Sequence, residues 1–292
     1  AGVDRCTFIK AHDLENWRED ETPVADTLES ALFAAEKWNF NIGDYTRLLN
    51  GIPKEYPALK SIAHRIAQGL RTSANKVYVL DVTQKQKRTT KCFSHSLGEN
   101  ITIENKFIQP FLRGEDIKAF HLQGARQVVI IPYVTSGGHS KLIEENTLKK
   151  DAKKTFAYLK RNKTFLEDRE RGRMRDSNWY AYIYPKNIEL MTSQKILVPD
   201  VADRASFALD RLGEYAFTSG YALTFKSDRK ESIEYFLALL NSNLLTFFLK
   251  SVSTSLRGGF FRYFSQYLEQ LPIKTIDFSN ADERKAHDYI VK

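Results

Sequence analysis

The sequence has few cysteines, no long apolar run and no secretory signal at its start. Two cysteines among 292 residues, Cys6 and Cys92, provide no disulfide framework, so a reducing cytosol is the expected compartment. The longest apolar run, residues 235–249, contains Asn241, Ser242 and Asn243, and it is too short and too polar to span a bilayer. We therefore expect a cytoplasmic protein without a membrane partner.

The sequence also lacks the short motifs that bind phosphates or metals. No Gly-x-Gly-x-x-Gly follows a strand, and there is no Walker loop. The six histidines are scattered singly, and none forms His-Glu-x-x-His or lies near a cysteine cluster. These absences argue against a zinc site and against a cofactor bound by this chain.

One permissive pattern points to an enzyme instead. Pro199-Asp200, followed by Asp228-Arg229-Lys230, fits the Pro-Asp…Asp-x-Lys arrangement of many metal-dependent nucleases. In such enzymes two carboxylates hold Mg²⁺ and a lysine lies near the attacking water. Here, however, Asp228 and Lys230 lie in a polar turn between a predicted strand and a predicted helix. A Mg²⁺-dependent nuclease domain using Asp200, Asp228 and Lys230 therefore remains an alternative.

Positive charge is what the sequence has in excess. It contains 44 Lys and Arg against 36 Asp and Glu, a net charge of +8, which indicates an anionic partner. Residues 152–175 alone carry nine basic and three acidic residues, and the aromatic stretch 177–185 follows directly. A basic stretch next to aromatic residues suits a phosphate backbone beside bases or sugars. The alternative is a solvated helix face with internal ion pairs, for example between Glu167 and Arg171.

The hydrophobic patterns predict a mixture of strands and helices. Because β-α-β units do not alternate regularly, we expect the α+β class, with mixed sheets and packed helices. Residues 14–30 are acidic and have the composition of a linker, and residues 56–70 have helical or turn-rich spacing. The expected strands are 1–12, 75–82, 126–133, 194–201, 206–210 and 215–226, and the expected helices are 147–171 and 231–252.

Six stretches in a fixed order carry a more specific pattern. They are residues 65–80, 107–120, 128–133, 157–185, 195–225 and 237–273. Together they resemble the target recognition region of Eco57I/TaqI-like adenine-N6 DNA methyltransferases, including the fused type IIG restriction-modification enzymes. Residues that match the family motifs are Gly69, Thr72, Asn75, Leu112, Arg113, Gly114, Asp116 and Asn241. At Ser73 the sequence departs from the family, which usually has Gly.

The resemblance implies a TaqI-like DNA specificity domain over residues 50–275, followed by a C-terminal tail at 276–292. Residues 1–49 then correspond to the terminal strand of a preceding methyltransferase domain plus a linker. The catalytic Asn-Pro-Pro-Tyr and the cofactor-binding glycines of the family are missing, and Ile-Ile-Pro-Tyr at 130–133 does not replace them. The chain alone is therefore expected to have no turnover and no catalytic residue.

The implied partners are double-stranded DNA and the methyltransferase domain of the same parent chain. S-adenosylmethionine would be the cofactor of that parent and not of this chain. Whether the parent also cleaves DNA stays open. A type I restriction-modification specificity subunit is a further alternative, although such subunits usually carry two recognition domains joined by long helices.

The glycine pair Gly258-Gly259 predicts a sharp turn or a close approach to a partner. Arg257 and Arg262 would then reach phosphates or a guanine edge, while Phe260, Phe261 and Tyr263 pack the turn onto the domain. Arg113 is expected either to contact DNA or to form a framework ion pair with Asp116. Base-reading residues are expected in loops 83–99, 134–146 and 172–178. The residues predicted to bind DNA are Arg71, Lys85, Lys87, Arg88, Arg113, Lys118, Lys160, Lys163, Arg169, Arg171, Arg173, Arg175, Trp179, Arg257 and Arg262.

Overall fold

The computed structural model describes residues 4–10, 24–29 and 51–292. At the N-terminal end, β1 (Arg5–Lys10) pairs antiparallel with β2 (Val24–Glu29). The predicted strand at 1–12 is therefore confirmed over residues 5–10, and residues 24–29 of the segment 14–30, which was predicted as a linker, form the strand β2. Most of the acidic residues that looked like a linker lie before Val24, and pairing of β1 with β2 satisfies the backbone groups that face the partner strand. The other residues of these two predictions lie outside the described part of the chain.

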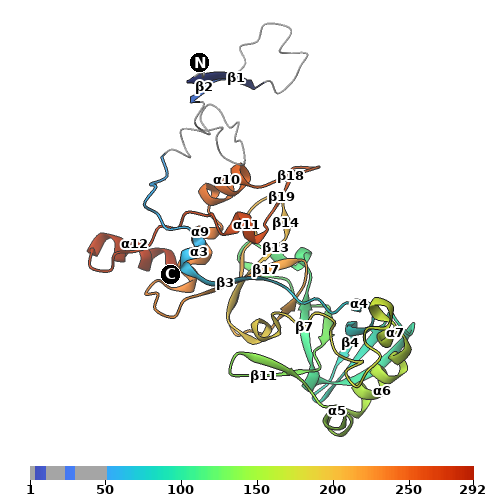
Figure 1. Cartoon of the computed structure of the whole chain (residues 1–292). Helices are drawn as coiled ribbons and strands as arrows, with labels where there is room; N and C mark the ends of the chain where they lie inside the picture. Colours follow the sequence, from blue (N-terminus) through green and yellow to red (C-terminus); the bar gives the residue numbers. More distant parts are fainter. Residues whose placement is uncertain (1–3, 11–23, 30–50) are drawn as a thin grey trace.

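A six-stranded sheet forms the centre of what we call the first lobe (Figure 1). Its neighbours are antiparallel, except that β16 runs parallel to β7. In spatial order the strands are β16 (Ala216–Phe217), β7 (Ile108–Leu112), β10 (Gln127–Ile130), β4 (Val79–Lys85), β5 (Thr89–Ser94) and β6 (Glu99–Glu104). The helices of this lobe are α4 (Asn75–Tyr78), α5 (Glu145–Asp151), α6 (Lys153–Arg161), α7 (Lys163–Glu167), α8 (Arg169–Gly172) and the 3₁₀ helices η2 (Asn105–Phe107) and η4 (Ile188–Thr192).

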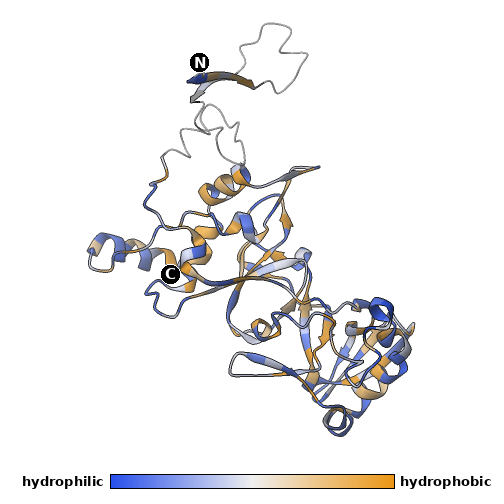
Figure 2. Cartoon of the chain, viewed as in Figure 1, coloured by the Kyte–Doolittle hydropathy of each residue, from blue (hydrophilic) through white to orange (hydrophobic). Residues whose placement is uncertain are grey.

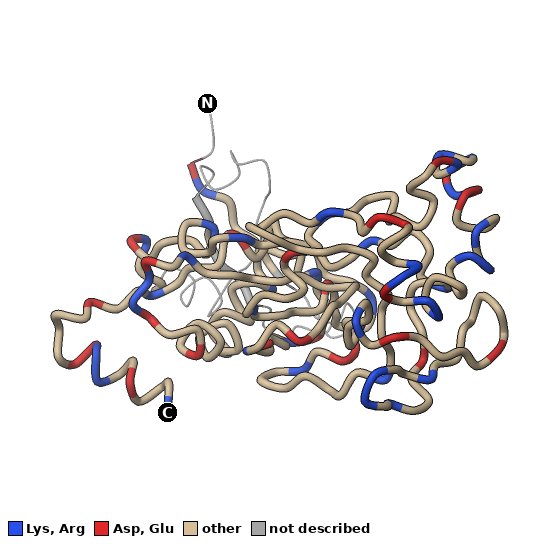
Figure 3. The backbone as a smooth tube through the Cα atoms, turned by 90° about the horizontal axis from the view of Figure 1, so that it is seen from below, with Lys and Arg blue, Asp and Glu red and all other residues tan. Residues whose placement is uncertain are grey.

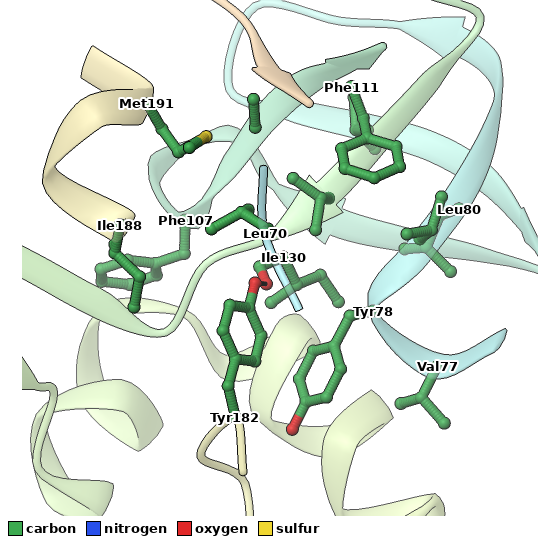
Figure 4. Close-up of a cluster of buried hydrophobic side chains, with 14 of the residues drawn as sticks. Leu70, Val77, Tyr78, Leu80, Phe107, Phe111, Ile130, Tyr182, Ile188 and Met191 are labelled. Carbon is green, nitrogen blue, oxygen red and sulfur yellow. Dashed lines mark hydrogen bonds between the residues drawn. The ribbon is translucent and has the colours of Figure 1, made fainter. Parts of the chain in front are cut away.

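The first lobe has an aromatic centre (Figure 4). The rings of Tyr78 and Tyr182 meet edge to face with centroids 5.0 Å apart. The hydroxyl of Tyr182 donates to the carbonyl of Ile130 at 2.6 Å, so its buried polar end has an acceptor. Burial drives the packing of these rings, and the hydrogen bond fixes how the ring is oriented.

A second lobe is built around α9 (Ile233–Leu240) and α10 (Asn243–Val252), which Figure 2 shows as mainly hydrophobic. Its other helices are α3 (Leu59–Ile62), α11 (Ser265–Leu268) and α12 (Ala281–Val291). It also contains the small sheet of β14 (Val201–Ala202), β19 (Phe260–Arg262) and β18 (Ser255–Leu256). The remaining hairpins are β8 (Ile117–Lys118) with β9 (His121–Leu122), and β11 (Tyr133–Ser136) with β12 (His139–Leu142).

A four-stranded sheet joins the two lobes. Its order is β15 (Ala208–Asp210), β13 (Lys195–Pro199), β17 (Gly220–Phe225) and β3 (Ala63–Gln68). Along β13, Leu197 belongs to the hydrophobic core of the first lobe, whereas Ile196 and Val198 belong to that of the second. Because both faces of the sheet are covered, β13 is a continuous buried run without polar alternation. The predicted α+β class with mixed sheets is confirmed.

Two long predicted helices are broken in the structure. The helix expected at 147–171 is four short helices, α5 to α8, which are separated at Ala152, Asn162 and Asp168. Ala152 and Asn162 have non-helical φ and ψ angles, and within α8 Glu170 and Arg171 have positive φ angles of 46° and 62°. The helix expected at 231–252 ends at Leu240 and restarts at Asn243 with a bend of 62°. At this break, the Ser242 hydroxyl accepts the backbone N–H of Leu245, which caps α10.

Within the described residues, no single helix is long and apolar enough to cross a membrane. Only α9 and α10 taken together, across their 62° bend, have the necessary length and composition.

Two further segments mix helix and strand where the sequence predicted one of them. In 56–70, one helical turn, α3, leads into β3, and in 75–82 one turn, α4, leads into β4. The expected tail at 276–292 contains α12, whose first turn is capped by the Asn280 side chain. His287 of α12 lies against Tyr235 of α9 with ring centroids 5.2 Å apart, so this helix packs on the second lobe.

Candidate nucleic-acid interface

A polar groove runs along the junction of the two lobes. It consists of three adjoining hollows of about 440, 180 and 260 Å³. Asp200 and Ser219 line both the first and the second hollow, and Gln68, Gly69 and Arg71 line both the second and the third. We call the three hollows together the interlobe groove. Its charged lining residues are Arg71, Arg113, Lys118 and Lys186 on the basic side and Glu115, Asp200 and Asp203 on the acidic side.

Glycines allow the backbone segments under this groove to meet. A Cβ atom on Gly69 would lie 2.3 Å from the carbonyl oxygen of Phe217, and one on Gly114 would lie 2.6 Å from that of Ser219. A Cβ on Gly220 would lie 2.5 Å from the carbonyl oxygen of Val198. No side chain fits at these distances, so the family-pattern glycines Gly69 and Gly114 serve close packing.

Arg113 is held in place by a chain of hydrogen bonds on the surface of the first lobe. Its Nε donates to Oε1 of Gln127 at 3.0 Å, and Nε2 of Gln127 donates to Oδ1 of Asp81 at 2.6 Å. Oδ2 of Asp81 lies 2.7 Å from Nε2 of His95. Asp116 accepts the backbone N–H of Arg113 at 2.7 Å, and its carboxylate forms no ion pair with the guanidinium among the described contacts. The predicted framework ion pair is therefore wrong.

The charge of Asp81 fixes this arrangement. Partial burial raises the pKa of Asp81, but hydrogen bonds from Gln127 and His95 outweigh that effect and leave the pKa below its ordinary value. A carboxylate only accepts hydrogen bonds, so Gln127 must turn its amide nitrogen to Asp81 and its oxygen to Arg113. Because Nε of Arg113 donates to Gln127, the other two nitrogens of the guanidinium, Nη1 and Nη2, are left for a ligand.

Of the other predicted cations, Arg71 and Lys118 line the groove, whereas Arg257 and Arg262 are not among its lining residues. Arg71 and Lys118 are exposed, and Nη2 of Arg71 donates to Oε1 of Gln68 at 3.0 Å. Arg257 is exposed in the turn between β18 and β19, while Arg262 is half-buried with its guanidinium carbon 5.0 Å from the ring centroid of Phe264.

The predicted sharp turn at the glycine pair is confirmed, since Gly258 and Gly259 have φ angles of 82° and 79°. Packing of the following aromatics is confirmed for Tyr263, which is buried, and in part for the half-buried Phe261. For Phe260 it is wrong, because this ring is 43% exposed and lines the groove.

Arg169 and Trp179 cannot contact DNA as predicted, because the structure buries both side chains. Nε of Arg169 donates to the carbonyl of Leu166 at 2.7 Å, and Nη2 donates to the carbonyls of Trp179 and Ala181 at 2.9 and 2.8 Å. Arg169 therefore joins α8 to the aromatic stretch inside the first lobe.

Much of the positive charge of the basic stretch at 152–175 is neutralised by carboxylates close by in the chain. Arg173 pairs with Glu170 at 3.1 Å, and Arg175 pairs with Asp168. The predicted Glu167–Arg171 pair is not found, because Glu167 lies 3.6 Å from Lys163 instead. Figure 3 shows Asp and Glu interspersed with Lys and Arg along the chain. Lys160 and Arg171 are exposed, so within this stretch they remain candidates for DNA binding, together with the cations that form ion pairs.

The structure does not bring the other predicted site residues to the groove lining. Lys85, Lys87 and Arg88 are exposed around the β4–β5 turn. Lys85 is four residues beyond Asp81, about 13 Å along the strand. The β11–β12 hairpin, in the predicted reading loop 134–146, extends from the first lobe (Figure 1), and Gly137 and Gly138 have positive φ angles at its turn.

The nuclease interpretation is wrong on geometry. Asp200 follows the end of β13 at which Pro199 pairs with Gly220, whereas Asp228 follows the opposite end of β17. The five residue-to-residue steps from Gly220 to Phe225 separate these ends by about 17 Å. Among the described residues, no group of three or more His, Cys, Asp or Glu side chains could hold a metal ion.

The sequence reasoning missed Asp81, His95 and Gln127, the residues that hold Arg113, and the groove residue Lys186. One signal was present, because Asp81 is a charged residue within an apolar strand pattern. No sequence signal pairs it with Gln127, since the two meet only through the register of β4 with β10.

Comparison with known proteins identifies the family to which this fold and groove belong. The model of the TaqI-like C-terminal specificity domain matches residues 109–273, more than half of the chain, so the chain belongs to this family. The resemblance seen in the sequence is confirmed.

Curated relatives are similar over nearly the whole chain. The type II restriction enzyme and methyltransferase RM.Eco57I of Escherichia coli is 24% identical over 98% of this chain and 30% of its own length. The type II methyltransferase M.PaeR7I of Pseudomonas aeruginosa is 24% identical over 93% of this chain and 43% of its own. The type II methyltransferase M.BstVI of Geobacillus stearothermophilus is 24% identical over 91% of this chain and 44% of its own length. The chain thus spans less than half the length of these relatives.

Proposed function

We propose that this chain recognises a specific sequence in double-stranded DNA for an adenine-N6 methyltransferase domain of the same parent protein. The observation that carries the proposal is Arg113, exposed at the interlobe groove with its orientation fixed by Gln127. Membership of the specificity-domain family and the similarity to type II methyltransferases support it.

Different residues of the groove lining contact the phosphates and the bases. Arg71 and Lys118 contact phosphates, which gives affinity and places the duplex along the groove. The planar end of Arg113 suits two parallel hydrogen bonds to phosphate oxygens or to O6 and N7 of a guanine. The carboxylates of Glu115 and Asp200 accept hydrogen bonds from base amino groups and repel a misplaced phosphate.

In this proposal the catalytic steps belong to the parent protein. Residues 50–275 are the recognition domain, and residues 1–49 supply the last strand of the methyltransferase domain and a linker. The parent uses S-adenosylmethionine and takes the target adenine out of the base stack before methyl transfer. This chain holds the duplex while that happens, and by itself it has no turnover.

The test begins with selection of duplexes from a random-sequence pool by the full chain, followed by fluorescence anisotropy at several salt concentrations. A variant with Arg71, Arg113 and Lys118 changed to Gln should bind the selected duplex weakly. The plot of the logarithm of its binding constant against the logarithm of the salt concentration should have a slope that is shallower by roughly 2–3. Each lost phosphate contact reduces the steepness of this slope by about 0.9.

The matched control changes Arg284, Lys285 and Lys292 to Gln, which removes the same charge from exposed positions on and after α12. If no sequence is enriched, or if both triple variants bind alike, the proposed function of the groove is wrong. Methyl transfer from S-adenosylmethionine by the chain alone would also contradict the proposal.

A type I specificity subunit is less well supported. Such subunits join two recognition domains by long helices, whereas the longest helix among the described residues, α12, has 11 residues. The relatives quoted above are type II enzymes.

A further inference from the structure

Phe120 combines two features that are rarely found together. Its φ angle is 62°, in the left-handed region that favours glycine, and its side chain is 62% exposed. A bulky residue in this conformation is a clear outlier, and a ring this exposed gains little from burial to offset the strain. Glycine at this position would adopt the same backbone conformation without strain, so the stability of the fold does not explain the phenylalanine.

The position of Phe120 is beside the interlobe groove. Phe120 is the second of two residues in the turn from β8 to β9, between Lys118 and His121, which pair across the hairpin. Lys118 lines the first hollow, and so does Ser206, the neighbour of Phe207. The backbone N–H of Phe120 donates to the carbonyl of Phe207 at 2.8 Å, which ties the turn to this edge of the groove.

The turn is also rigidly held. The same carbonyl of Phe207 accepts from Nδ2 of Asn241 at 2.9 Å, while Oδ1 of Asn241 accepts the N–H of Phe207 at 3.0 Å. The side chain of Ile117, at the start of the hairpin, is buried. The ring of Phe120 is therefore presented to solvent on a support that is fixed at three points.

We propose that Phe120 is a wedge that inserts between two adjacent base pairs of the DNA bound in the interlobe groove. Proteins that kink DNA insert apolar side chains of this kind at a base step. The neighbouring Lys118 and His121 are both exposed and flank the ring, so they can bind the phosphates on either side of the opened step. The proposal rests on the proposed function, because it requires DNA in the groove.

Phe120 would contribute to specificity without hydrogen bonding to a base. Opening a base step costs least at flexible pyrimidine–purine steps, so a wedge favours sequences that have such a step at the right distance from the bases that are read. Two other exposed aromatic residues line the groove, Phe260 and Tyr184, and neither has a positive φ angle. Phe260 belongs to β19, where it pairs with Leu256, and the hydroxyl of Tyr184 donates to Oε1 of Glu170 at 2.7 Å.

The experiment uses the full chain and a duplex selected by it from a random pool, so that failure of DNA recognition itself appears at the selection. Two probes then report on insertion. A 2-aminopurine placed in turn at each step of the selected duplex brightens where stacking is lost, and dyes on the two ends report a kink of roughly 20–90° by energy transfer. With the native chain we expect brightening at one step and a kink.

The test variants are Phe120→Ala and Phe120→Gly. Both should lose the brightening and the kink and should bind the selected duplex roughly 10- to 100-fold more weakly, in keeping with the loss of one base–aromatic stack. Their salt slope should stay that of the native chain, since no phosphate contact is removed. Phe120→Gly should melt at the same temperature as the native chain or higher, because it relieves the strain.

The matched control is Phe165→Ala, which removes another exposed ring, on α7, that lies over Lys76 rather than at the groove. It should leave both probes unchanged. Unchanged brightening and kinking in Phe120→Ala would refute the wedge. So would a lower melting temperature of Phe120→Gly, which would show that the ring stabilises the fold.

Discussion

Nη2 of Arg169 lies 2.9 Å from the carbonyl oxygen of Trp179, inside the first lobe. Among the arginines of the basic stretch, Arg169 is the buried one, and its partners are backbone carbonyls rather than carboxylates. Its guanidinium also donates to the carbonyls of Leu166, Thr72 and Ala181, and none of the described carboxylates pairs with it. Four carbonyl groups therefore depend on one cation.

Replacement of Arg169 should destabilise the fold. In Arg169→Lys, a single ammonium cannot reach all four carbonyls, so the free energy of unfolding should fall by roughly 2–4 kcal/mol, because buried acceptors are left without donors. Urea unfolding followed by circular dichroism measures this. Arg171→Lys, at an exposed site, is the control and should change the value by less than about 0.5 kcal/mol. Equal midpoints for the two variants would show that the buried contacts do not matter.

Gln127 should act on DNA through Arg113. Gln127→Leu removes the hydrogen bond that orients the guanidinium, so it should weaken binding to a selected duplex in the same direction as Arg113→Gln. The double variant should lose less than the sum of the two losses, with a coupling of about 0.5–3 kcal/mol, because both changes remove one arrangement. Anisotropy titrations of the four proteins give the cycle. Gln123→Leu, at an exposed position, is the control. Strictly additive losses would rule out the positioning role.

Gly69 should tolerate no side chain. In Gly69→Ala the new Cβ would lie 2.3 Å from the carbonyl oxygen of Phe217, backbone against side chain, so one segment must move. We expect a loss of about 1–3 kcal/mol in the free energy of unfolding, as for other overpacked sites. Gly124→Ala, where no atom lies within 4 Å of the new Cβ, is the control and should be neutral or slightly stabilising. Urea unfolding of both variants decides the matter, and similar stability of the two would contradict the close packing.

Glu104 should make stability depend on pH. Its carboxylate accepts the backbone N–H groups of Lys154 and Thr155, both at 2.9 Å, and so caps α6 from a neighbouring strand. Partial burial raises the pKa of Glu104, but these two hydrogen bonds and the one from the Thr155 hydroxyl lower it by a larger amount. The pKa in the folded state therefore lies below that in the unfolded state. The stabilisation is therefore present above the unfolded pKa and is lost as pH falls through the folded pKa.

The measurement is the melting temperature between about pH 3 and pH 6, which brackets the ordinary glutamate pKa of roughly 4.3. Glu104→Gln should cost about 1 kcal/mol at neutral pH, like the loss of other helix caps. It should also flatten the rise of melting temperature across that range, whereas Glu55→Gln, at an exposed site, should not. An unchanged profile in Glu104→Gln would show that the cap does not titrate.

Several features followed from the sequence because they depend on local chemistry. The turn at Gly258-Gly259 was predictable, since adjacent glycines allow positive φ angles, and the strand at 194–201 was predictable from its apolar run. Ser73, where the family usually has Gly, has a φ angle of 56°, which explains that preference of the family. The order of the six family stretches also identified the class of domain, which the family match confirms.

Other features were decided by tertiary contacts. The charge of Arg169 pointed to DNA, but the position of the aromatic stretch against α8 buried the guanidinium under four carbonyls. The breaks in the two long predicted helices depend on residues far away in sequence, such as Glu104 capping α6 and Phe207 binding Asn241. Helical periodicity cannot predict such breaks, because the competing hydrogen-bond partners come from other elements.

The sequence by itself determined the class of the domain, the excess of basic residues and most strand positions, because these depend on composition and on patterns of neighbouring residues. Only the tertiary structure decided which cations are exposed at the groove. Arg113 and Arg169 are alike as residues, yet strand register places Gln127 beside the exposed Arg113, while packing of α8 encloses Arg169. Exposure and hydrogen-bond partners are set by segments that meet only after folding, and no local pattern contains that information.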